Sequence, residues 1–197
     1  TMRLCLLCFV ALWCLAQNVS VAADNTESDL SETARLLAIL LDSGRVAIGR
    51  NQTLINDPSN AQTAFTPELF ATHLTGIFKE RTGHNLNDLP NANVPTLAKG
   101  LLERLLIESK KTVESYQPVL NMKGLKYKGL IPATFSTETA TRFQKWSGVY
   151  VKQTAPEHLL RNAGNKPDSF EAEHMKELSD ASSSRNTESV FSKIEGG

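Results

Sequence analysis

Four histidines are the residues best suited to metal binding or acid–base chemistry, because imidazole ligates metals and titrates near neutral pH. They are scattered along the chain, and no pair has the spacing of a metal site or of an HExxH motif. They stand at positions His73, His84, His158 and His174. A lone histidine is more often a surface or core residue than a ligand. We therefore single out only His158, which lies in a loop of unusual composition.

Motifs for nucleophilic or phosphate chemistry are missing from the sequence, which contains no GxSxG, P-loop or GxGxxG pattern. Glu171 and Glu173 are two residues apart on a predicted helix, so their carboxylates do not face each other. We expect no catalytic site, no metal site and no enzymatic activity.

The first of three unusual segments is KGLIPATF at positions 128–135, within which stand Lys128, Gly129, Pro132 and Ala133. Gly-x-x-Pro-Ala inside an apolar run indicates a sharp turn from a strand into a helix. We favour an architectural role for this segment.

The other two unusual segments are VKQT at 151–154, within a predicted strand, and the loop RNAGNKPDSFE at 161–171. Polar side chains on a strand can aim hydrogen-bond donors into a pocket, and Asn and Asp can fix a loop by bonding to nearby backbone. Arg161 is placed either to pair with Asp168 or Glu171, or to bind a ligand anion. The predicted ligand-binding residues are Lys152, Gln153, His158, Arg161 and Asn162, and the predicted structural residues of the loop are Asn165, Pro167, Asp168 and Glu171.

Together these segments resemble a family of bacterial extracytoplasmic domains with a PAS-like fold, in which KGxIPAxF precedes KQT and an RNPxNxPDxxE loop. The family includes cyanobacterial c-type haem proteins and the sensor regions of membrane-bound histidine kinases. The resemblance extends from about residue 36 to 197, and Ala163 stands where the family usually has proline. It implies a sensory or ligand-binding module whose partners are a small ligand or haem and a signalling or membrane protein.

The resemblance also implies haem, but no Cys-x-x-Cys-His segment occurs in this sequence. Non-covalent haem would need a histidine in an apolar cleft. We expect the domain to continue beyond Gly197. Two alternatives stay open: a periplasmic c-type haem redox carrier, if an attachment segment follows, and a cofactor-free structural partner that presents its long first helix.

Hydrophobic periodicity predicts helices at 29–55, 67–82, 95–116, 136–146 and 167–178. Alternation of apolar and polar residues predicts strands at 125–127, 149–154 and 188–194. This order predicts an α+β fold, a PAS-like antiparallel sheet with a long N-terminal helix and a helical subdomain.

The N-terminus predicts the compartment. Residues 4–15 are almost wholly apolar, too few to span a bilayer, and small residues precede Ala23. We expect a signal peptide over 1–23, cleavage after Ala23 (or after Ala16) and one periplasmic or otherwise extracytoplasmic domain over 24–197; an uncleaved anchor is the alternative.

All three cysteines lie in the signal segment, so the mature domain has no disulfide. Lys+Arg and Asp+Glu are equal at 21 each, so we expect no nucleic-acid partner.

Overall fold

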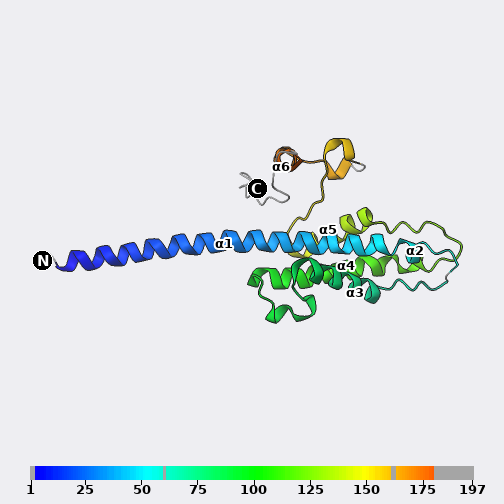
Figure 1. Ribbon diagram of the computed structural model, residues 1–197, viewed down its shortest axis with the longest axis horizontal. Helices are drawn as coiled ribbons and strands as arrows, with labels where there is room; N and C mark the ends of the chain where they lie inside the picture. Colours follow the sequence, from blue (N-terminus) through cyan, green and yellow to red (C-terminus); the bar gives the residue numbers. More distant parts are fainter. Residues whose placement is uncertain (1–2, 60, 161–162, 180–197) are drawn as a thin grey trace.

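The computed structural model describes the backbone of residues 3–59, 61–160 and 163–179, and the side chains of 27–59, 61–160 and 164–179. Within these ranges the regular structure is helical (Figure 1). The α-helices are α1 (Arg3–Arg50), α2 (Gln52–Ile55), α3 (Pro67–Thr82), α4 (Thr96–Leu120), α5 (Pro132–Ser147) and α6 (Ser169–Ser179). Three short 3₁₀ helices, η1 (Leu86–Asn91), η2 (Glu157–Leu159) and η3 (Ala163–Asn165), lie in the connections.

The core lies in a bundle in which the C-terminal half of α1 packs against α3, α4 and α5. Apolar residues recur at helical spacing on each of these helices, which gives each one a stripe to bury. Five phenylalanines are the largest fully buried side chains of the core, and three of them contact one another edge to face or tilted. They are Phe65, Phe70, Phe78, Phe135 and Phe143, all with no exposed side-chain surface.

The predicted α+β fold is wrong, because the described residues contain no strand and therefore no PAS-like sheet. Residues 125–127 form an exposed loop, and residues 149–154 run without regular structure. The third predicted strand, at 188–194, lies outside the described residues.

The misleading signal at 149–154 has a physical cause. Val149 and Val151 pack against the core, whereas Tyr150 between them is 62% exposed. The alternation is therefore real, but it belongs to a single extended segment with one face on the bundle. A strand also needs a partner to satisfy its backbone groups, and periodicity says nothing about partners.

The first helix differs from the prediction at both ends. It runs from Arg3 and so does not begin at Asp29. Near Asp29, Glu32 pairs with Arg35 one turn later, and the Thr33 hydroxyl donates to the Asp29 carbonyl, as happens inside a helix. At its other end, Asn51 interrupts the helix before the short α2. The predicted cleavage point after Ala23 falls within α1, and cleavage there stays a prediction. No helix in the described ranges has the length and apolarity needed to cross a membrane.

The start of α3 and the ends of α3 and α5 are confirmed. The Thr66 hydroxyl accepts from the Leu69 amide at 3.2 Å and Pro67 opens α3. Gly83 and Gly148 end α3 and α5 in the left-handed conformation that glycine tolerates. However, α4 continues past the predicted end at 116, and Pro118 lies in its last turn.

The KGLIPATF segment leads into α5 from an irregular loop and not from the predicted strand. Lys128 is 2% exposed, and its ammonium donates to the carbonyls of Asp57 and Leu120. Its amide donates to Asn56 Oδ1 at 3.0 Å. Gly129 then takes a φ of 77° and Pro132 begins α5. These contacts fix the loop before α5 to the end of α2.

Candidate functional site

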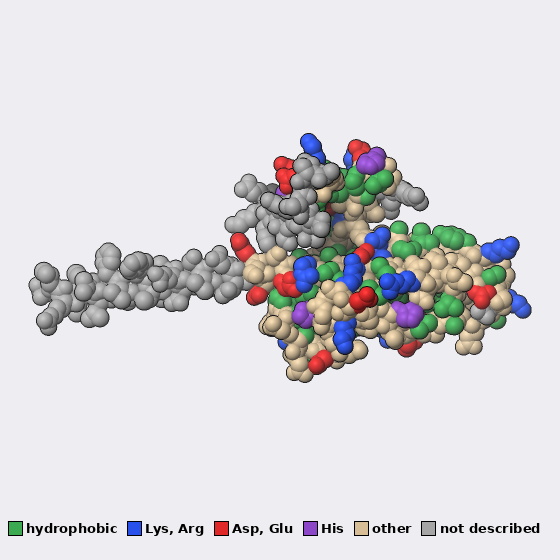
Figure 2. Space-filling model, in the orientation of Figure 1, with side chains coloured by type: hydrophobic (Ala, Val, Ile, Leu, Met, Phe, Trp, Pro, Cys, Tyr) green, Lys and Arg blue, Asp and Glu red, His purple; other side chains and the backbone are tan. Residues whose placement is uncertain are grey.

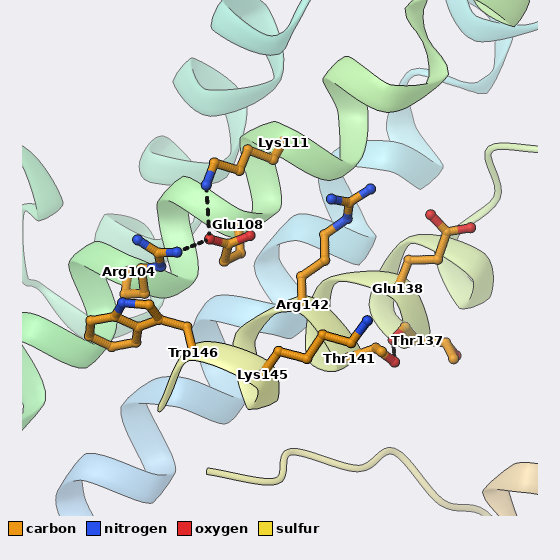
Figure 3. Close-up of a pocket in the computed structure, with 9 residues that line it drawn as sticks. All are labelled: Arg104, Glu108, Lys111, Thr137, Glu138, Thr141, Arg142, Lys145 and Trp146. Atoms are coloured by element: carbon orange, nitrogen blue, oxygen red, sulfur yellow. Dashed lines mark hydrogen bonds and ion pairs between the residues drawn. The ribbon is translucent and has the colours of Figure 1, made fainter. Parts of the chain in front are cut away.

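An open groove of about 660 Å³ lies between α4 and α5 (Figure 3). We call it the basic groove, because four of its side chains are cationic and two are carboxylates. Its lining residues are Arg104, Glu108, Lys111, Thr137, Glu138, Thr141, Arg142, Lys145 and Trp146. In Figure 2, by contrast, acidic and basic side chains are mixed on the face of the bundle that is shown.

Two of the four cations in the basic groove pair with Glu108, whose single negative charge leaves the trio with one net positive charge. This carboxylate is only 5% exposed, and its Oε1 accepts from Arg104 at 2.6 Å and from Lys111 at 3.2 Å. The three residues share one face of α4 because they are spaced by three and four positions. Arg104 also lies 4.8 Å from the centroid of the Trp146 ring, which favours a cation–π contact. This cluster stabilises the wall of the groove and leaves Glu108 little negative charge to offer.

The other two cations, Arg142 and Lys145, make no hydrogen bond or ion pair with any described residue. Both come from α5, and Arg142 projects toward the space between Glu108 and Glu138 (Figure 3). Thr137 is exposed beside them, and its hydroxyl donates to no described residue. The groove therefore presents guanidinium, ammonium and hydroxyl donors that an oxyanion can accept from.

The second carboxylate of the groove, Glu138, is held at its edge by Tyr116. The Tyr116 hydroxyl donates to Glu138 Oε1 at 2.6 Å. Burial of the phenol, and to a smaller extent this hydrogen bond, raise the pKa of Tyr116 to about 12. Tyr116 thus stays protonated at neutral pH and remains a donor to Glu138.

The sequence offered a partial signal for this groove. Arg104, Glu108 and Lys111 form a run of alternating charge on one helix face, and Arg142, Lys145 and Trp146 share a face of the next. Each set alone is typical of a solvated helix surface. Only the packing of α4 against α5 brings the two sets together.

The ligand-binding residues predicted from the sequence lie elsewhere. Lys152 and Gln153 line a smaller hollow of about 120 Å³, which shares Thr137 and Thr141 with the basic groove. His158 lines a separate hollow with Lys166 and Asp168, among others. Arg161 and Asn162 lie outside the described residues. Ligand binding by this set stays a prediction.

Lys152 has structural partners in this arrangement. Its ammonium donates to Glu171 Oε2 at 2.6 Å and to the Lys166 carbonyl at 2.7 Å. The hydrogen bond to Glu171 raises the pKa of Lys152. Glu171 also accepts from the Asp168 amide, and Asp168 accepts from the Glu171 amide, which is a capping box at the start of α6. We call the contact between Lys152, Lys166 and Glu171 the Lys152 latch, because it joins α6 to the segment that follows α5.

Neither His73 nor His158 is arranged as an axial haem ligand. The Asn51 amide donates to the Ala47 carbonyl and lies 2.9 Å from His73 Nδ1, so this nitrogen accepts and Nε2 carries the proton. Iron binding at Nε2 would require the other tautomer, in which Nδ1 carries the proton and cannot accept from Asn51. The His158 ring has no hydrogen-bond partner among the described residues to orient it, and the hollow that it lines contains four charged side chains. Within the described ranges, no three His, Cys, Asp or Glu side chains are grouped so as to hold a metal ion.

Comparisons with known proteins returned no match: no family model, no curated protein and no solved structure is similar to this chain. The resemblance to the haem-associated family therefore stays a prediction, and the PAS-like fold that it implied is contradicted by the helical structure.

Proposed function

We propose that this protein is a non-catalytic binding module that holds a small organic anion in the basic groove. The observation that carries the proposal is the pair Arg142 and Lys145, two cations without a partner among the described residues, in a groove whose buried acid is already paired with Arg104 and Lys111. Charge-assisted hydrogen bonds are the stronger ones, and an arginine recognises a carboxylate or phosphate through its fork of donors.

Trp146 extends the proposal from a bare anion to an anion with a flat apolar part. Its side chain is 53% exposed although it lies at the edge of a charged groove. Arg104 lies over the indole ring, and the exposed part of the ring offers a surface on which an aromatic ligand can stack. We therefore expect an aromatic carboxylate to bind more tightly than an aliphatic one of the same charge.

We propose further that the module works outside the cytoplasm and that ligand binding serves a sensory role, as expected from the N-terminal sequence and the family resemblance. The rival role, in which α1 presents an apolar face to another chain, has less support. Between residues 30 and 48 of α1, only Leu30 among the large apolar side chains is exposed, at 40%, because the rest pack into the bundle.

The test is a titration of the full chain with acetate, benzoate and inorganic phosphate, followed by calorimetry and by tryptophan fluorescence. We expect benzoate to bind about two- to fivefold more tightly than acetate because of stacking on Trp146. Replacing Arg142 with Gln should weaken benzoate binding about tenfold, since one charge-assisted hydrogen bond is lost.

Two variants serve as controls. Glu138→Gln removes a negative charge from the groove and should strengthen binding of the anion, whereas Lys79→Gln, on α3, should leave it unchanged. Equal affinity in the wild type, Arg142→Gln and Glu138→Gln would show that anions do not use this groove.

A further inference from the structure

The loop between α4 and α5 exposes large apolar side chains next to lysines. All six residues from 122 to 127 are exposed, and we call them the 122–127 loop. Met122 is 53% exposed, Leu125 37% and Tyr127 62%. Lys123 and Lys126 alternate with them along the chain. Exposed apolar surface is unfavourable in water, so three such side chains within six residues indicate a contact surface.

The fold holds this loop in place rather than letting it collapse onto the bundle. The Gly124 amide donates to the Pro58 carbonyl at 2.8 Å, and Gly124 has a φ of 83°. On one side of the loop, Asn121 Oδ1 accepts from the Thr63 amide at 2.9 Å. On the other side, the buried Lys128 is bonded to the Asp57 and Leu120 carbonyls. The apolar side chains are thus presented outward by a fixed backbone.

The local charge identifies the kind of partner. The stretch from 121 to 131 contains three lysines and no acid, and the ammonium of Lys128 is buried, which leaves Lys123 and Lys126 at the surface. The neighbouring carboxylate, Asp57, accepts hydrogen bonds from Ser59. Apolar side chains flanked by lysines, with a tyrosine among them, match the interface of a bilayer that carries anionic headgroups.

We propose that the 122–127 loop inserts into the interface of an anionic lipid bilayer. Met122, Leu125 and Tyr127 enter the headgroup region, while Lys123 and Lys126 contact the anionic headgroups. The loop lies at the end of the bundle opposite the N-terminal end of α1 (Figure 1), and hydrophobic, basic and acidic side chains lie together at this end in Figure 2. The contact is therefore separate from any that the apolar residues 4–15 make.

The experiment is cosedimentation of the full chain with vesicles of phosphatidylcholine alone and of phosphatidylcholine with phosphatidylserine. The apolar residues 4–15 are common to every variant, so the contribution of the loop is the difference between variants. Met122→Ser with Tyr127→Ser should weaken binding to the anionic vesicles at least about tenfold. Lys123→Gln with Lys126→Gln should weaken it about 25-fold, or about fivefold per lysine at low salt.

The matched control is Leu97→Ser, which removes an apolar side chain that is 54% exposed at the start of α4, at the other end of this helix. It should leave vesicle binding unchanged. Because all the replaced side chains are exposed, unfolding by urea should be the same in all variants. The proposal is overturned if both loop variants bind like the wild type, or if the wild type binds neutral vesicles as strongly as anionic ones. The first result would leave a protein as the partner of the loop, and the second would remove the role of the two lysines in headgroup binding.

Discussion

The replacement of Gly44 by alanine tests how closely α1 and α5 are packed. A Cβ atom at Gly44 would lie 2.5 Å from Phe135 Cε1, 2.6 Å from Phe135 Cζ and 3.3 Å from Leu74 Cδ1. The Phe135 ring cannot swing away easily, because it is fully buried and its centroid lies 5.2 Å from that of Phe70. Overpacking of this kind costs about 1–3 kcal/mol of the free energy of unfolding.

The gain in helix propensity partly offsets this cost, since alanine stabilises a helix interior by about 1 kcal/mol relative to glycine. We therefore expect Gly44→Ala to destabilise the protein by roughly 0–2 kcal/mol. The matched control is Gly100→Ala on α4, where a Cβ would meet no atom within 4 Å, and which should stabilise the protein by about 1 kcal/mol.

Urea unfolding followed by circular dichroism measures both variants, and their difference isolates the steric cost. A second replacement, Phe135→Leu, should reduce the penalty of Gly44→Ala by making room for the methyl group. If Gly44→Ala and Gly100→Ala are equally stable, the close contact between α1 and α5 does not exist and the reasoning fails.

Three further variants test other contacts. Lys128→Met leaves one buried and one half-buried carbonyl without the ammonium and should cost about 2–4 kcal/mol of unfolding free energy in urea. Stability like that of the wild type would contradict the anchoring role. The raised pKa of Tyr116 contributes stability below about pH 10 that is lost as the pH rises toward about 12. The difference in unfolding free energy between the wild type and Tyr116→Phe should therefore shrink over this interval. A constant difference would contradict the raised pKa. Lys152→Gln opens the Lys152 latch and should speed hydrogen exchange in α6 several-fold, because α6 has no buried residue to hold it. The control Lys145→Gln should leave the exchange unchanged. Unchanged exchange in Lys152→Gln would show that the latch does not hold α6.

Local signals in the sequence predicted the helices and several of their ends. Thr66 and Pro67 marked the start of α3, and Gly83 and Gly148 marked two ends, because these residues act through their own backbone and immediate neighbours. The lack of a sheet among the described residues could not be predicted in the same way. The alternation at 149–154 is also produced by a lone segment lying on a bundle, and whether a partner strand exists depends on distant parts of the chain.

The basic groove could not be predicted for a related reason. The two cations that have no partner among the described residues belong to α5. The ion-paired side chains of the opposite wall belong to α4, some 30 residues earlier in the chain. Helical periodicity shows which residues share a face, but it does not show which two faces meet. The same holds for the Lys152 latch. From the sequence, Lys152 was predicted to bind a ligand, whereas in the structure its ammonium donates to Glu171.

The overall charge of the chain differs from the local charge at the two proposed binding surfaces. Equal numbers of acidic and basic residues give the whole chain no long-range attraction for an anion. At physiological ionic strength, however, an exposed charge acts over only about 8 Å, so a binding surface responds to its neighbours and not to the total. Arg142 and Lys145 have no partner among the described residues, and Lys123 and Lys126 stand in a stretch without acids. If both proposals hold, binding at each of these two surfaces should therefore weaken steeply with salt, although the net charge of the protein is zero.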